Sequence, residues 1–158
     1  MTKKKVFISS LICVFLLGFI NNATGQNQQK LKIEKQVDSI FHIMIKYADN
    51  LEYDKLTKGV DDRYNAGFIT NGSYFSQYDS LINSIKIKSL GVTKQSITIQ
   101  KEKITVVSDN IVLLTSFGET KFNVNNDNTF NINFYWSFVF EKFDNNWKVI
   151  QSHQSTIR

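Results

Sequence analysis

A run of alternating aromatic and polar residues near the end of the chain constrains the fold more than any other feature. From residue 130 to residue 140, every second side chain is large and apolar: Phe130, Ile132, Phe134, Trp136, Phe138 and Phe140. The residues between them are mostly polar. A period of two places alternate side chains on opposite faces of a β-strand. The run therefore predicts a long strand with one face in a core and the other face toward solvent.

The same period recurs in three further stretches, each bounded by turn-forming residues. We expect strands at about 93–107, 111–124 and 147–156, with a bulge possible inside the first of them. Turns rich in Asn and Asp separate these strands, the last of them at residues 144–146. Four long consecutive strands joined by short turns are typical of an antiparallel sheet.

The loop between the last two strands decides which side chains share a face. A loop of two residues, either Asp144-Asn145 or Asn145-Asn146, pairs even-numbered positions with odd-numbered ones. The side chains that would then share a face are Trp136, Phe138, Val149, Gln151, His153 and Ser155. A loop of three residues would reverse this phase. With the shorter loop, the polar members of the group mark either a cavity wall or an internal hydrogen-bond network.

Three helices are expected before the sheet. Apolar residues three and four positions apart form one stripe along residues 33–51, and residues 52–60 are typical of a second, shorter helix. Ser76 is a candidate N-cap for a third helix, which we expect to stop before Gly91. Between the last two helices, Asn71-Gly72 predicts a turn between two short extended pieces. Helices followed by an antiparallel sheet indicate the α+β class.

Residues 1–25 have the layout of a secretory signal peptide. Three lysines precede an apolar run from Val6 to Ile20, and Ala23-Thr24-Gly25 offers a small-residue cleavage site. As a helix the apolar run covers roughly 22 Å, less than the ~30 Å hydrocarbon core of a bilayer, so we expect no stable membrane anchor. We therefore predict that residues 26–158 form one domain that is secreted or periplasmic.

Charge and composition exclude several classes of function. Three of the nineteen basic residues lie in the predicted export segment and none of the fourteen acidic ones, so most of the formal net charge of +5 would leave with it. We expect no nucleic-acid partner. The single cysteine lies in the same segment, which excludes a disulfide framework. The two histidines lie on different predicted elements without metal-ligand spacing, so we expect no metal and no cofactor.

The closing hairpin carries a resemblance to a known superfamily. An aromatic-rich strand 138–143, a tight turn, Trp147-Lys148-Val149 and then His153-Gln154-Ser155 resemble the nuclear transport factor 2-like (NTF2-like) superfamily. Within it, the chain looks most like SnoaL-like and DUF4440-type bacterial domains, over roughly residues 31–157. The resemblance implies a cone in which helices close one side of a curved antiparallel sheet and leave a pocket at the open end. It also implies a homodimer formed through the outer face of the sheet.

His153 is the best single candidate for a catalytic group. Imidazole has an ordinary pKa of about 6.5, so it can give and take a proton near neutral pH. No acidic residue could be matched to the acid or base that the superfamily's enzymes use. The predicted ligand-binding residues are His153, Trp136, Phe138, Gln151, Tyr64 and Tyr74. His153 could instead make only an internal hydrogen bond, with Trp136 and Phe138 as ordinary core residues.

Three functions follow from the resemblance and these residues. We favour an exported domain that binds a small apolar or amphipathic molecule in an aromatic-lined pocket. The first alternative is a SnoaL-like isomerase, cyclase or dehydratase that uses His153 as acid or base. The second alternative is a dimeric assembly module without catalysis.

Overall fold

The computed structural model describes the backbone of residues 5–125 and 128–157, with side chains from residue 25 onward. The chain divides into two compact units, with the boundary between Ile33 and Glu34. The second unit contains every strand of the described residues. In chain order the elements are α1 (Lys5–Asp49), the 3-10 helix η1 (Tyr53–Gly59), β1 (Phe68–Thr70), β2 (Ser73–Phe75), α2 (Tyr78–Lys88), β3 (Val92–Ser108), β4 (Ile111–Val124), β5 (Asn128–Phe143) and β6 (Asn146–Ile157).

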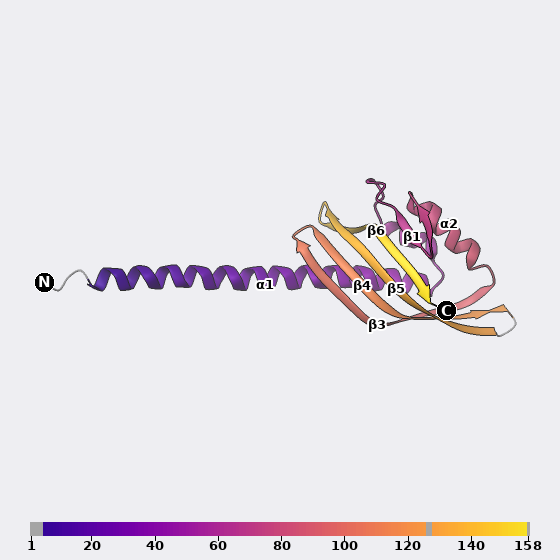
Figure 1. Cartoon of the computed structure of the whole chain (residues 1–158), viewed down its shortest axis with the longest axis horizontal. Helices are drawn as coiled ribbons and strands as arrows, with labels where there is room; N and C mark the ends of the chain where they lie inside the picture. Colours follow the sequence, from indigo (N-terminus) through magenta and orange to yellow (C-terminus); the bar gives the residue numbers. More distant parts are fainter. Residues whose placement is uncertain (1–4, 126–127, 158) are drawn as a thin grey trace. The chain divides into compact units, whose positions relative to one another are not determined.

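The strands form one sheet of six strands in the order β2-β1-β6-β5-β4-β3. Neighbouring strands are antiparallel except β1 and β6, which run parallel. The four long strands β3 to β6 lie side by side as curved ribbons (Figure 1). The α+β class and the curved sheet are therefore confirmed, and the sheet is antiparallel from β3 to β6. The bulge expected inside the first long strand is also present, as one of its register shifts falls between Ile99 and Lys101.

The helices agree with the prediction only in part. The first begins at Lys5 instead of residue 33, and the second is a 3-10 helix. The third follows the β1–β2 hairpin, so the helices do not all precede the sheet. Its N-cap is Gln77 and not Ser76. A carboxylate from the loop between η1 and β1, Asp62 Oδ2, accepts from the Tyr78 amide at 3.1 Å and satisfies a free donor at this helix end.

The predicted export segment lies mostly outside the residues with described side chains. Its backbone from Lys5 onward belongs to α1. Cleavage and export therefore stay a prediction. Among the residues whose side chains the structure describes, no helix is both long enough and apolar enough to cross a membrane.

The core of the second unit lies between the inner face of the sheet and the apolar stripe of α1 from Val37 onward. Phe134, Phe138 and Phe140 are buried, as the period of two predicts. Phe41 of α1 packs against Phe138, with ring centroids 5.7 Å apart. Trp147 at the start of β6 donates from Nε1 to Gln36 Oε1 at 3.2 Å, which ties the same helix to the hairpin. The helix stripe and the central strand thus bury one another.

The loop between β5 and β6 has the predicted two residues, Asp144 and Asn145. Both have positive φ, at 45° and 66°, as the central residues of a type I′ turn require. Next to the turn the strands pair as expected, with Phe140 opposite Val149. Even positions on β5 therefore do face odd positions on β6 in this part of the hairpin.

A β-bulge then reverses the phase of β6. Val139 pairs with Gln151, which leaves Ile150 as an extra residue on β6. Beyond it, Trp136 pairs with Gln154, and His153 pairs with Ser137 on the opposite face of the sheet. The prediction that His153 shares a face with Trp136 is therefore wrong. The loop length was correct, but one additional residue in the strand exchanged the inner and outer side chains.

Candidate functional site

A cavity of about 630 Å³ opens between the inner face of the sheet and the helices α1, η1 and α2 of the second unit. Its wall is mainly apolar. The lining includes six Phe and Trp side chains: Phe41, Phe122, Phe130, Phe134, Trp136 and Phe138. A volume of this size is typical of sites for small organic ligands.

The aromatic wall is built by the alternation on β5. Phe134 and Trp136, two residues apart on one face, stack with ring centroids 3.8 Å apart. Trp136 in turn meets the edge of Phe138 at 6.3 Å. Phe122 on the neighbouring strand stacks on Phe130 at 5.4 Å. Because these rings hold one another in place, the wall presents a fixed apolar surface to a ligand.

A small polar group interrupts this apolar wall. The Tyr53 hydroxyl of η1 donates to Gln95 Oε1 of β3 at 2.8 Å, and both residues are buried. Burial raises the pKa of Tyr53, and a hydrogen bond with Ser89 acts in the opposite direction. Burial also raises the pKa of Tyr78, whose side chain lines the same cavity. Both phenols stay protonated at neutral pH, so the group offers neutral hydrogen-bonding atoms to a ligand.

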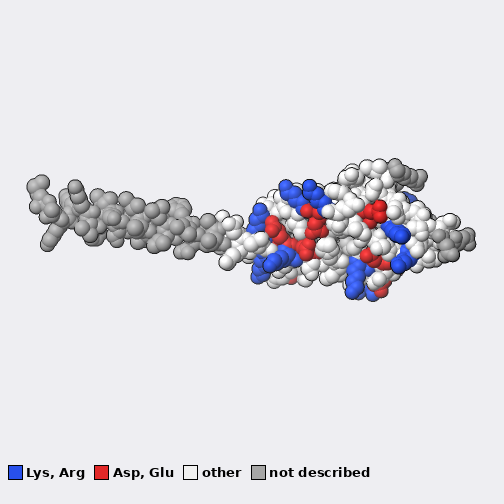
Figure 2. Space-filling view, turned by 90° about the horizontal axis from the view of Figure 1, so that it is seen from below, with Lys and Arg blue, Asp and Glu red and all other residues white. Residues whose placement is uncertain are grey.

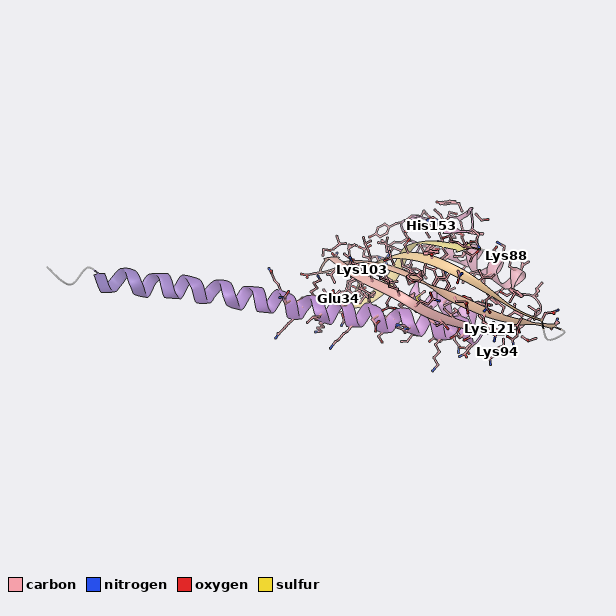
Figure 3. All side chains as sticks on the ribbon, turned by 60° about the horizontal axis from the view of Figure 1, so that its bottom comes forward. Glu34, Lys88, Lys94, Lys103, Lys121 and His153 are labelled. Atoms are coloured by element: carbon pink, nitrogen blue, oxygen red, sulfur yellow. The ribbon has the colours of Figure 1, made fainter. Side chains whose placement is uncertain are left out.

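Lys88 is the one charged residue among the described residues that line the cavity. It lies in the last turn of α2 and is exposed, which places it at the rim. Lys94 and Lys121 lie at the same end of the domain, whereas Lys103 lies toward the other end (Figure 3). Neither of the first two lines the cavity. An anionic group at the rim would therefore meet the ammonium group of Lys88.

The structure brings two of the predicted ligand-binding residues into this cavity, Trp136 and Phe138. His153 is exposed on the outer face of the sheet, where it lines a shallow groove with Lys103 and Ser155. His153 could act as a catalytic group inside the cavity only if its side chain were on the other face of β6. Whether any of these residues binds a ligand stays a prediction.

Three other predicted site residues also lie away from the cavity lining. Gln151 follows the bulge on β6 and pairs with Val139. The Tyr64 hydroxyl lies 3.3 Å from Glu141 Oε1 at the protein surface. The ring of Tyr74 is largely exposed and lies against Gly67. Tyr64 lies in the loop before β1 and Tyr74 lies in β2, and both side chains are exposed.

Sequence reasoning did not find the polar members of the site. Tyr53 and Gln95 are 42 residues apart, on a short helix and on a strand. No spacing rule connects two such positions, because only the packing of η1 against the sheet brings them together. Lys88 could have been suspected from its place at the end of a predicted helix, yet that place alone is typical of a cation that stabilises a helix terminus.

A second cluster of ionisable side chains lies outside the cavity lining. Asp38 and His42 are one turn apart on α1, and Glu102 comes from β3. Burial, and then the neighbouring Asp38 carboxylate, raises the pKa of Glu102, whereas the imidazole of His42 lowers it. On the face of the molecule shown in Figure 2, acidic and basic side chains are mixed and do not form a continuous basic surface.

A curved sheet covered by helices, with a cavity on its inner face, defines an NTF2-like α+β domain. The chain belongs to the SnoaL-like domain family, whose model matches residues 37–158. No curated protein matches the sequence.

Solved structures share this fold at low sequence identity. An NTF2-like superfamily protein from Salmonella enterica has a TM-score of 0.72 and 12% identity, over 82% of this chain and 94% of that chain. The hexachlorocyclohexane dehydrochlorinase LinA-type3 from Novosphingobium barchaimii has a TM-score of 0.69 and 12% identity, over 84% and 91% of the two chains. An NTF2-like protein of unknown function from Shewanella oneidensis has a TM-score of 0.58 and 17% identity, over 77% and 98%. These similarities show the fold alone.

Proposed function

We propose that this protein binds a small amphipathic molecule with an apolar body and an anionic head group. The observation that carries the proposal is the cavity of about 630 Å³, apolar on its walls, with Lys88 at its rim. We place this binding outside the cytoplasm, because residues 1–25 have the layout of a signal peptide.

The apolar body supplies most of the binding free energy in this proposal. Each Å² of apolar surface removed from water contributes about 25 cal/mol, and the aromatic wall of β5 provides that surface without rearrangement. The Tyr53–Gln95 pair and Ser89 offer hydrogen bonds to a polar atom of the ligand inside the cavity. The charge of Lys88 then selects anionic ligands over neutral ones of the same shape.

Binding is favoured over catalysis because of what lines the cavity. Among the lining residues that the structure describes there is no Asp, Glu or His. Burial raises the pKa of both lining tyrosines, which makes them poor bases at neutral pH. The remaining ionisable group, Lys88, is exposed at the rim of the cavity.

The charge selectivity can be tested with two fluorescent probes that differ by one sulfonate: anilinonaphthalene sulfonate and its uncharged parent, N-phenylnaphthylamine. We expect both probes to bind. Lys88→Glu should weaken the sulfonate about tenfold, because it replaces an attraction at the rim with a repulsion. The affinity for the uncharged probe should change by less than about twofold. Fluorescence titration measures both dissociation constants.

Lys94→Glu is the matched control, since it makes the same change of charge at the same end of the domain but outside the cavity lining. It should leave both affinities close to those of the unmodified protein. Failure of both probes to bind would refute the binding function itself. Binding of both probes with equal losses in the Lys88 and Lys94 variants would refute only the role given to Lys88.

Self-association through the outer face of the sheet is a further part of the proposal. Tyr135 and Leu113 are exposed there, and Tyr135 stacks on Phe117 of the neighbouring strand with centroids 5.8 Å apart. Exposed apolar side chains on one face favour contact with another protein surface. Sedimentation velocity should show a dimer, and Tyr135→Glu should give a monomer with an unchanged circular dichroism spectrum. A monomer for the unmodified protein at about 100 μM would contradict this.

A further inference from the structure

Three side chains of the types that can bind a metal ion converge where α1 passes over β3. Asp38 and His42 are four residues apart, so both project from the same face of the helix. His42 Nε2 lies 3.5 Å from Asp38 Oδ1 and 3.3 Å from Glu102 Oε2. One ligand atom from each residue lies within 4.8 Å of the other two. None of the three residues lines the cavity, so the cluster is independent of the proposed ligand site.

The separations fit the donor spacing of a small divalent cation. Zinc binds imidazole nitrogen and carboxylate oxygen at about 2.0–2.2 Å in a tetrahedron, which separates neighbouring donor atoms by about 3.4 Å. Glu102 Oε2 is buried and accepts no hydrogen bond from any residue that the structure describes, although the imidazole nitrogen is 3.3 Å away. The distance between Glu102 Oε2 and His42 Nε2 is therefore close to the separation of two ligand atoms bound to one ion.

A second, independent observation comes from β4. Ser116 pairs directly with Glu102 across the two strands, so both side chains are on the same face of the sheet. Ser116 is only 6% exposed, and within the described part of the chain its hydroxyl oxygen has no hydrogen-bond partner. A buried polar group without a partner costs roughly 1–3 kcal/mol. A metal ion with a bound water molecule would satisfy the serine hydroxyl and the glutamate oxygen together.

We propose that Asp38, His42 and Glu102 form a binding site for a divalent transition-metal ion, with Zn²⁺ as the best fit. Three protein ligands leave a fourth position of the tetrahedron for water, beside Ser116. This reverses the expectation from the sequence that His42 binds no metal. The spacing Asp38-x-x-x-His42 was visible in the sequence, but the third ligand is 60 residues further on and comes close only through the packing of helix on sheet.

Isothermal titration of the purified protein, without an affinity tag, with zinc chloride tests the site. We expect one ion per chain. Glu102→Gln keeps the shape of the side chain and removes its charge, and it should weaken binding at least about tenfold, as should His42→Ala. His153→Ala is the matched control, because it removes the other histidine of the chain, which lies on the outer face of the sheet. It should leave the affinity unchanged.

Thermal unfolding with and without zinc gives a second readout. Zinc should raise the melting temperature of the unmodified protein and of the His153 variant, because an ion that binds only the folded state stabilises it. It should not raise that of the Glu102 variant. If His42→Ala fails to fold, the Glu102 variant carries the test. Absence of binding at about 1 mM zinc, or equal losses in the Glu102 and His153 variants, would overturn the proposal.

Discussion

Phe140→Ala is expected to lower the free energy of unfolding by about 3–5 kcal/mol. Phe140 is fully buried on the inner face of β5, with its ring centroid 6.2 Å from that of Phe138. It pairs with Val149 next to the closing turn, where the sheet is held on both sides. The substitution removes a large apolar side chain and leaves a cavity that the surrounding strands cannot close.

Urea unfolding followed by circular dichroism measures this change. Tyr64→Ala is the control, because it removes a similar ring that is 54% exposed at the surface. It should cost about 0.5 kcal/mol or less. Equal losses for the two variants would contradict the placement of Phe140 in the core.

Gly118→Ala is expected to cost about 3 kcal/mol, which is large for the addition of one methyl group. A Cβ atom at Gly118 would lie 2.0 Å from the carbonyl oxygen of Thr98 and 2.8 Å from Cζ of Phe134. Thr98 belongs to the adjacent strand β3, just before its bulge at Ile99 and Lys101. The backbone of β3 therefore has to move, and it can do so only by disturbing the hydrogen-bonded ladder.

Gly59→Ala is the control for the added methyl group. Its Cβ would meet only the side chain of Met44, at 3.0 Å from Sδ, and this flexible side chain can change rotamer. The loss of stability should be clearly smaller than for Gly118. A Gly118 variant as stable as the unmodified protein in the same urea titration would show that β3 and β4 are further apart than described.

Much of the sheet could be predicted because local rules determine it. The alternation from Phe130 to Phe140 defines β5, and the residues Asp144 and Asn145 accept the positive φ of the turn that follows. The bulge at Ile150 could not be predicted in the same way. Ile150 is not a glycine or another residue that marks a bulge in the sequence, and the extra residue shows only in the pairing of β6 with β5.

The residues of the candidate site likewise fall into those that local rules predict and those that tertiary packing determines. Trp136 and Phe138 were predicted, since their faces follow from alternation within one strand. His153 was misplaced, because its face depended on counting across the bulge. Tyr53 with Gln95, and Glu102 with His42, join elements far apart in the chain, and such contacts depend on tertiary packing that no local pattern encodes.

The bulge also divides β6 into two halves that differ in which residues face inward. Before it, the odd-numbered Trp147 and Val149 point inward and anchor the core, and after it the even-numbered Gln154 and Thr156 line the cavity. Substitutions at Gln154 and Thr156 therefore change the lining of the cavity, whereas substitutions at Trp147 and Val149 change the core. One additional residue in the strand thus lets a single strand contribute alternate side chains to two different parts of the same inner face.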